Sequence, residues 1–131
     1  MDRATEKEIN ASLYGRRSKY GVDTTAKGRE ARTYQGITFH SKHEMEVYRD
    51  YVLPNLNIGV FENLKFQVRY ELHAHTPPGW PVKVGTYIAD FVATDRQGKP
   101  VIMDAKGYRT AEYKLKKAIF EAEYQLRIME L

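Results

Sequence analysis

The sequence VIMDAKGYR, residues 101–109, contains the feature on which the fold assignment rests. Three apolar residues run directly into Asp104, and Lys106 follows two positions later. An apolar run of this kind that ends near a glycine, at position 107, is typical of a buried strand that emerges into a turn. Because strand side chains alternate between the two faces of a sheet, Asp104 and Lys106 are predicted to share one face. Such a pair is either the ordinary charged end of a strand or half of a metal-dependent phosphodiesterase site.

Two segments on either side of this stretch have the pattern of helices. Residues 41–53 (SKHEMEVYRDYVL) predict a helix that begins with Ser41 as its N-cap and ends before Pro54. Residues 110–124 (TAEYKLKKAIFEAEY) predict a second helix, for which Thr110 is a suitable cap.

The other segments are predicted to form strands and the turns that join them. In chain order these are a short strand or turn at 34–39, a strand at 63–75, a loop at 76–81, a hairpin of 82–95 and 100–106 around the turn at 96–98, and a last strand at 125–131. Alternation in the first long strand predicts four apolar side chains on one face: Phe66, Val68, Tyr70 and Leu72. The order helix, three strands, helix, strand predicts an α/β (α+β) fold, a mixed sheet flanked by helices.

Composition sets the broad class of the protein. A chain of 131 residues without cysteine predicts one domain that uses neither disulfides nor thiolate metal sites. The chain has no apolar stretch long enough for a membrane helix, which needs about 18 residues, and the first thirty residues lack the apolar core of a signal peptide. We therefore expect no membrane partner and a cytoplasmic location. The 21 basic and 17 acidic residues give a net charge of +4, which is compatible with a nucleic-acid partner.

Basic residues are concentrated before the predicted domain. Residues 1–33 show no helical or strand period, and they predict a largely irregular basic arm ahead of a domain at 34–131. The arm contributes six candidate DNA contacts: Arg16, Arg17, Lys19, Lys27, Arg29 and Arg32. The alternative is a solvated, partly disordered terminus. Arg109, the last residue of the opening stretch, is a further candidate DNA contact.

A second carboxylate is expected near Asp104. Asp90 lies within the apolar run YIADFVA, where an uncompensated charge would be costly. A hairpin of the two strands would bring both carboxylates to the same end of the sheet, where they repel unless a cation lies between them. Oxygen ligands of this kind suit Mg²⁺ or Mn²⁺. The Lys106 ammonium could then orient a water molecule or stabilise charge on a phosphate.

A third carboxylate is expected from the first predicted helix. At about 100° per residue, Glu44 falls on the apolar face of this helix and Glu46 falls roughly opposite, on the solvated face. Glu44 is therefore the candidate for the site. The alternative is a capping box, because Ser41 and Glu44 have the S-x-x-E spacing.

These residues together resemble the PD-(D/E)XK nuclease superfamily, whose core has the same order of helices and strands. More narrowly, the chain resembles a family of small phage and prophage proteins long catalogued without a function. The segments that carry this resemblance are SKYG, GITFHSKHEMEVY, QVRYEL, YIADF, DAKGYRT and YKLKKAIFE. The proline of the superfamily motif is replaced by Ala89 in this chain.

The resemblance implies a role for each candidate residue. Asp90, Asp104 and the carbonyl of Ala105 would hold a divalent metal, and Glu44 would bind a second metal or its water. Lys106 would position the attacking water. Three further residues could assist the site or face the phosphates, and for each an ordinary structural role is the alternative: Gln67, Lys114 and Lys116.

The resemblance also implies an activity. We expect a Mg²⁺-dependent DNA endonuclease, in which Mn²⁺ can substitute, that hydrolyses phosphodiester bonds to leave 5′-phosphate and 3′-hydroxyl ends. Selectivity for branched DNA such as a Holliday junction, a homodimer, and a role in phage or prophage recombination, repair or replication are further expectations. The location would then be the cytoplasm of the bacterial host. The alternative is a non-catalytic nucleic-acid-binding protein that retains the nuclease fold.

Overall fold

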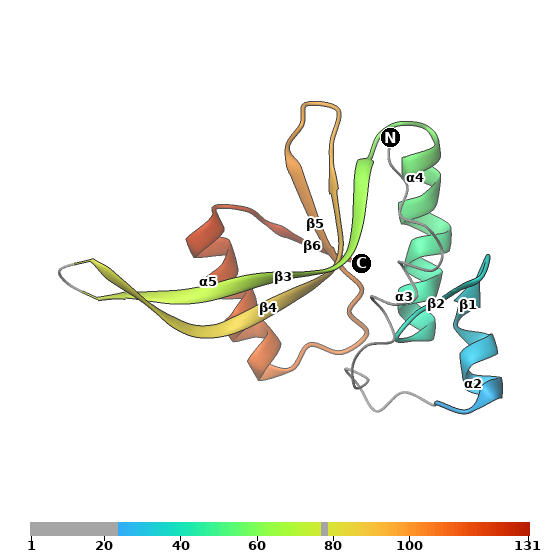
Figure 1. Cartoon of the computed structure of the whole chain (residues 1–131), viewed down its shortest axis with the longest axis horizontal. Helices are drawn as coiled ribbons and strands as arrows, with labels where there is room; N and C mark the ends of the chain where they lie inside the picture. The colour runs from blue at the N-terminus through green and yellow to red at the C-terminus, as the bar shows by residue number, and fades with distance from the viewer. Residues whose placement is uncertain (1–23, 77–78) are drawn as a thin grey trace.

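A four-stranded mixed sheet forms the centre of the molecule, with helices on both sides (Figure 1). The computed structural model describes residues 24–76 and 79–131. Its elements in chain order are α2 (Ala26–Ala31), β1 (Thr33–Tyr34), β2 (Ile37–Thr38), α3 (Lys42–Val47), the π-helical turn η1 (Tyr48–Val52), α4 (Leu53–Asn57), β3 (Glu62–Thr76), β4 (Trp80–Thr94), β5 (Pro100–Asp104), α5 (Ala111–Tyr124) and β6 (Ile128–Glu130). Strands β3, β4 and β5 pair antiparallel and β6 joins β5 in parallel. The predicted α/β class and the order of the main elements are confirmed.

The first predicted helix begins where expected but ends later. The Ser41 side chain accepts a hydrogen bond from the backbone N–H of Glu44, which confirms it as the N-cap of α3. The prediction of an end before Pro54 is wrong, because helical structure continues to Asn57. At Leu53 the backbone N–H donates to the carbonyl of Tyr48, five residues earlier. This wider π-type turn lets Pro54, which has no N–H, enter the first turn of α4 without loss of a regular α-helical hydrogen bond.

The core is divided between the two faces of the sheet. Alternate residues of β5 point to opposite faces: Met103 packs with the α3–α4 side, whereas Ile102 packs with α5. The α3–α4 cluster is centred on aromatic rings that include Phe39, Tyr48 and Phe91. The α5 cluster is centred on Phe120, which packs against the ring of Tyr87. Asp104 lies two positions after Ile102, so the strand geometry directs it to the α5 face.

Strand β3 changes faces at Gln67, which contradicts one prediction. Phe66 packs in the α3–α4 cluster, whereas Tyr70 and Leu72 pack in the α5 cluster. These apolar side chains therefore do not share one face. Gln67 lies between them with a positive φ of 51°, a conformation that breaks the alternation of a regular strand. Its side-chain amide donates to Oδ1 of Asp90 at 3.2 Å, so the bend is coupled to the buried carboxylate on the neighbouring strand.

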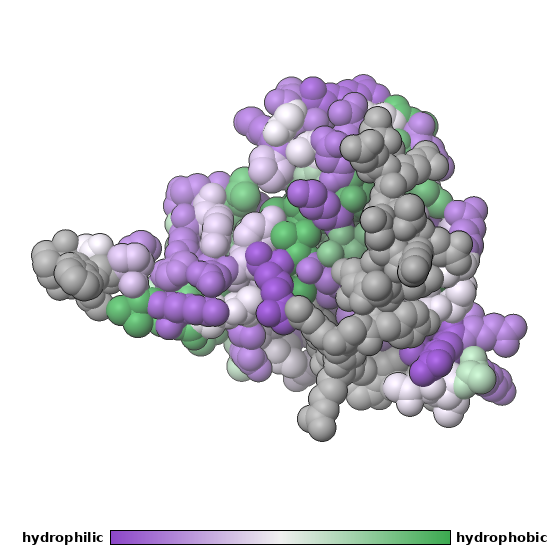
Figure 2. Space-filling view, in the orientation of Figure 1, coloured by the Kyte–Doolittle hydropathy of each residue, from purple (hydrophilic) through white to green (hydrophobic). Residues whose placement is uncertain are grey.

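The loop predicted at 76–81 is mostly strand. Thr76 pairs with Trp80, and only residues 77–78, which lie outside the described residues, separate β3 from β4. The two strands therefore form a ribbon whose end extends beyond the body of the molecule (Figure 1). Hydrophobic surface is visible near this end (Figure 2), and Val82 and Val84 are exposed there.

The prediction of an irregular arm is wrong over its last residues. Residues 26–31 form α2, capped by the side chain of Thr25, and β1 begins at Thr33. Arg32 is buried, and its Nε donates to the carbonyl of Phe39 at 2.7 Å. Its guanidinium supports the start of the domain, so Arg32 is less available to DNA than the exposed basic residues, and a DNA contact there stays a prediction. Three of the candidate contacts, Arg16, Arg17 and Lys19, lie outside the described residues.

No helix within residues 24–76 and 79–131 is long and apolar enough to cross a membrane.

Candidate active site

Two buried carboxylates lie next to each other on neighbouring strands. Phe91 of β4 pairs with Met103 of β5, and each is adjacent to one of the aspartates. Asp90 is 1% exposed and Asp104 is 0% exposed. Oδ2 of Asp90 accepts a hydrogen bond from the backbone N–H of Ala105 at 3.0 Å, which holds it against the chain immediately after Asp104. The structure thus brings together the two aspartates that the sequence places 14 positions apart.

Lys106 forms an ion pair with Asp104 inside the protein. Its Nζ lies 3.2 Å from Oδ1 of Asp104, and the two side chains are 3% and 0% exposed. A buried pair of this kind loses hydration on both groups, and its attraction does not reliably exceed that loss. Stability alone is therefore a weak reason for a lysine and an aspartate at these positions.

Two tyrosines contact this ion pair, and neither was assigned to the catalytic site from the sequence. The hydroxyl of Tyr87 donates to Oδ2 of Asp104 at 2.7 Å. The ring of Tyr113 lies with its centroid 4.5 Å from Nζ of Lys106, within the range of a cation–π contact. Burial first, and then the negative charge of Asp104, raises the pKa of both tyrosines, so both hydroxyls keep their protons at neutral pH. Tyr113 could be recognised as a residue on the buried face of its helix, but nothing local to Tyr87 indicates a partner 17 positions away.

Glu44 is buried on α3, and two of its hydrogen bonds are typical of a helix cap. The backbone N–H of Glu44 donates to Oγ of Ser41 at 3.0 Å, and Oε2 of Glu44 accepts from the backbone N–H of His40 at 3.3 Å. This is close to a capping box, except that the Glu44 carboxylate accepts from the backbone N–H of His40, the residue before the N-cap, and not from that of Ser41. The alternative interpretation of Glu44 is therefore supported by its contacts.

The described residues offer two carboxylates to a metal, not three. Within residues 24–76 and 79–131, no three His, Cys, Asp or Glu side chains converge as a metal-binding group, so Glu44 does not join Asp90 and Asp104 in this way. The oxygens of Asp90 and Asp104 are the ligand type that Mg²⁺ prefers. Because Mg²⁺ is commonly held by one or two carboxylates together with water and substrate phosphate, the pair fits such an ion but not an all-protein cage.

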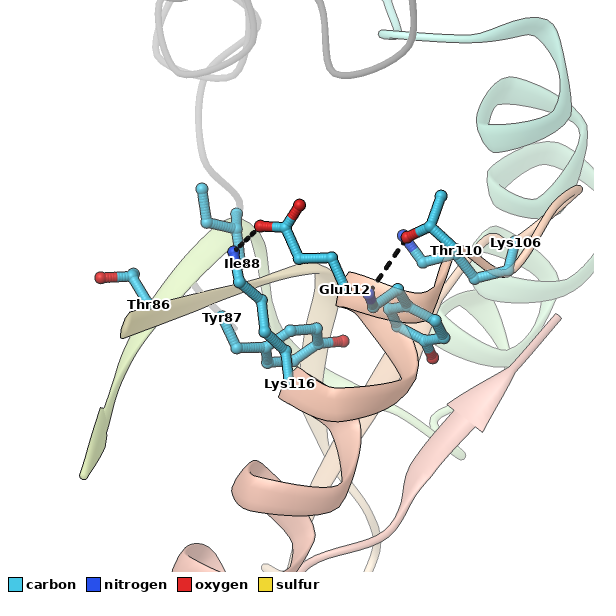
Figure 3. A pocket seen from close by; sticks show the side chains of 8 residues that line it. Thr86, Tyr87, Ile88, Lys106, Thr110, Glu112 and Lys116 are labelled. Atoms are coloured by element: carbon cyan, nitrogen blue, oxygen red, sulfur yellow. Dashed lines mark hydrogen bonds and ion pairs between the residues drawn. The ribbon is translucent and has the colours of Figure 1, made fainter. Parts of the chain in front are cut away.

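A pocket of about 340 Å³ opens beside Lys106, between β4 and the start of α5 (Figure 3). It is lined by Thr86, Tyr87, Ile88, Lys106, Thr110, Glu112, Tyr113 and Lys116. Lys116 extends across this pocket and pairs with Glu112 at 3.0 Å (Figure 3). Of the two helix lysines predicted to assist the site, Lys116 lines the pocket, whereas Lys114 is exposed to solvent on α5.

The remaining candidate DNA contacts differ in their solvent exposure and in their ion pairs with the protein. Lys27 and Arg29 are exposed on α2. Arg109 is about half exposed and forms an ion pair with Glu130, which also accepts a hydrogen bond from Lys117 at 2.6 Å. The hydrogen bond from Lys117 is the main cause that lowers the pKa of Glu130, to about 2. Arg109 is thus accessible but already oriented by a carboxylate.

Comparison with known proteins places the chain among sequence relatives without a described activity. Residues 17–129 match the family model described as "Protein of unknown function (DUF1064)". No curated protein and no solved structure matches the chain.

Proposed function

We propose that this chain, which belongs to the DUF1064 family of proteins of unknown function, is a Mg²⁺-dependent DNA endonuclease of the PD-(D/E)XK type. The observation that carries the proposal is the buried Lys106–Asp104 pair beside Asp90. Two carboxylates and one ammonium occupy adjacent strand ends, where apolar residues would stabilise the sheet at least as well. These groups suit metal-dependent hydrolysis of a phosphodiester, in which carboxylates hold a divalent ion and an ammonium can position the attacking water or stabilise charge on the phosphate.

Asp90 and Asp104 would hold the ion, with the carbonyl of Ala105 as a further ligand and Glu44 acting on a second metal or its water. Mg²⁺, when bound, supplies Lewis-acid stabilisation of phosphate charge and lowers the pKa of a bound water. When the ion is bound, contacts with it would replace some of the hydrogen bonds that the carboxylates now accept from the protein.

The residues around the carboxylates would fix their orientation. Gln67 contacts Oδ1 of Asp90, and Tyr87 contacts Oδ2 of Asp104. These neutral donors hold each carboxylate in place while leaving its charge available to a cation. Lys106 would orient the attacking water or stabilise the negative charge that develops on the scissile phosphate.

DNA is the proposed substrate, and branched or otherwise irregular DNA is the proposed preference. The net charge of +4, with exposed Lys27 and Arg29 on α2 and Lys116 in the pocket, supports a polyanionic partner. Selectivity for junctions, a homodimer, and a role in phage or prophage recombination, repair or replication rest on the resemblance described above.

A non-catalytic nucleic-acid-binding protein is the second candidate, and one observation favours it. Asp90, Asp104 and Glu44 all accept hydrogen bonds or ion pairs from protein donors, as they would in a network that only supports the fold. In this case the same basic residues would bind DNA without hydrolysis.

A cleavage panel distinguishes the two candidates. The purified protein is incubated with supercoiled plasmid, linear duplex, flap and four-way junction DNA, in Mg²⁺ and in EDTA. The proposal expects hydrolysis of at least one substrate in Mg²⁺, none in EDTA, and loss of hydrolysis in Asp90→Asn. Binding without hydrolysis of any of these substrates would favour the non-catalytic candidate.

A further inference from the structure

Lys106 lies between two pockets. Besides the pocket that faces α5, it lines a second pocket of about 250 Å³ on the side of α3. This second pocket is formed by the turn that follows β5, which includes Ala105, Tyr108 and Thr110, and by Ser41 and His43 at the start of α3. Its volume is below the range of about 300–1,000 Å³ typical of pockets that enclose drug-sized ligands, so it suits a single ring group.

Tyr108 in this second pocket has an unusual exposure for an aromatic residue. Its side chain is 79% exposed, although a tyrosine ring normally packs against other apolar groups. The two tyrosines within α5 are engaged by the fold: Tyr113 is buried against Lys106, and Tyr124 stacks on Phe120. Tyr108 therefore presents an aromatic face beside the proposed catalytic lysine.

The surroundings of Tyr108 complement a nucleotide. Arg109, which follows it in sequence, is about half exposed and paired with Glu130. Lys106, which lies two positions before Tyr108 and is paired with Asp104, lines the pocket. His43 lies across the pocket, held by a hydrogen bond from Nε2 to the carbonyl of Leu131 at 2.9 Å. A Cβ at Gly107 would meet no atom of a residue beyond its two chain neighbours within 4 Å, so the turn itself is not packed against the rest of the fold. An aromatic face with flanking cations suits a base that carries a phosphate.

We propose that Tyr108 stacks on one unpaired nucleobase next to the phosphate that Lys106 faces, and that this stack makes the protein selective for DNA with an unpaired nucleotide. The inference rests on the proposed function, since it requires DNA at Lys106. A base in a regular duplex is already stacked on both sides and cannot present its face to Tyr108. Bulges, flaps and junctions expose such a base at low cost. Tyr108 would thus be a specificity residue, not a catalytic one.

Binding of DNA that carries the fluorescent base 2-aminopurine tests this inference in EDTA, without any need for cleavage. One probe has 2-aminopurine unpaired in a single-nucleotide bulge, and the other has it paired in a matched duplex. Wild-type protein and Tyr108→Phe, which keeps the ring, should bind the bulged probe more tightly and quench its fluorescence. Tyr108→Leu should bind that probe roughly 5- to 100-fold more weakly, the range for loss of one base–aromatic stack, without quenching it.

The controls separate this result from general effects. Leu115→Ala removes a side chain that is 62% exposed on α5 and should leave both probes unaffected. Because Tyr108 is so exposed, its variants should unfold at the wild-type temperature. Equal affinity of wild-type protein for both probes, or an unchanged quench in Tyr108→Leu, would overturn the inference while leaving the proposed function intact. Absence of binding to either probe would overturn this inference, and absence of cleavage of every DNA in Mg²⁺ would reject the proposed function with it.

Discussion

At the scale of single residues, Asp104 is the best-defined group of the candidate site. Its carboxylate contacts a cation, Lys106, through one oxygen and a neutral hydroxyl, Tyr87, through the other. This arrangement keeps the buried charge compensated before any metal or DNA arrives. The sequence predicted Asp104, Lys106 and Asp90, because charged residues inside apolar runs are conspicuous. It did not indicate Tyr87, because a tyrosine in a strand is ordinary and its partner is distant in the chain.

Removal of the Tyr87 hydroxyl should destabilise the protein. Tyr87→Phe leaves one oxygen of a fully buried carboxylate without its 2.7 Å donor, and we expect the free energy of unfolding to fall by about 1–3 kcal/mol. Urea unfolding measures this change. Tyr124→Phe is the matched control, since its hydroxyl bonds to a carbonyl at the surface, and it should cost less. An equal or larger loss in the control would contradict the importance of the Asp104 contact.

Glu130 should make stability depend on acid pH. Its pKa is lowered from 4.5 to about 2, chiefly by the hydrogen bond from Lys117, so the native state keeps the charge to lower pH than the unfolded state. The stabilisation is complete above pH 4.5 and is lost as pH falls towards 2, because the unfolded state takes up the proton first. Because the Glu130 side chain is 16% exposed, its contribution to the free energy of unfolding should be on the order of 1 kcal/mol. The free energies of unfolding of the wild-type protein and Glu130→Gln should converge as the pH is lowered from 6 to 2.5. Parallel curves would contradict the lowered pKa of Glu130.

At the scale of elements, the caps of the two predicted helices were read correctly, whereas features that depend on distant residues or on irregular turns were missed. Ser41 and Thr110 cap α3 and α5 as predicted, because capping depends on residues within one turn. The continuation through Pro54 depends on a π-type turn, and the change of face at Gln67 depends on Asp90, which lies 23 positions away. Neither dependence has a local signature in the sequence. The assignment of Glu44 from a helical wheel gave the correct burial, but burial alone did not distinguish a cap from a metal ligand.

Glu44→Gln distinguishes the two candidate roles of Glu44, which are helix capping and binding of a second metal or its water. Glutamine can cap the helix nearly as well as glutamate, so the free energy of unfolding should change by less than about 1 kcal/mol. If Glu44 binds a second metal or its water, cleavage in Mg²⁺ should fall at least about tenfold because the charge is lost. Ser41→Ala, which should cost about 1 kcal/mol of stability, is the control for loss of capping. Unchanged cleavage by Glu44→Gln would restrict Glu44 to the cap.

At the scale of the whole molecule, the basic residues before the domain are proposed to bind DNA outside the active site. The domain boundary predicted at residue 34 would cut through β1 and remove Arg32, which is buried in the structure. The boundary could not be placed from composition, because Arg32 has the same charge as the other basic residues of the arm and is distinguished from them by burial and its contact with Phe39. A truncation that tests DNA binding must therefore leave residues 24–33 in place.

Deletion of residues 1–23 should weaken DNA binding and reduce its dependence on salt. This segment carries Arg16, Arg17 and Lys19, and each phosphate contact that it makes would contribute a slope of about −0.9 in a plot of log affinity against log salt concentration. Fluorescence anisotropy from 50 to 200 mM NaCl measures the slope. The rate of cleavage at saturating DNA should be retained, because Asp90, Asp104 and Lys106 remain. Unchanged slopes would show that these residues do not touch DNA, and sedimentation of the truncated protein would reveal a loss of dimer.

The most direct test of the nuclease account is single-turnover cleavage by Lys106→Gln at saturating DNA in Mg²⁺, with binding measured in parallel. The account predicts DNA affinity close to that of the wild-type protein and a cleavage rate lower by about 10²–10³-fold, since Lys106 acts on the water or on charge that develops in the transition state. Thermal unfolding of the variant establishes that it is folded under these conditions. Cleavage at the wild-type rate, or a loss of binding as large as the loss of cleavage, would contradict the role assigned to Lys106.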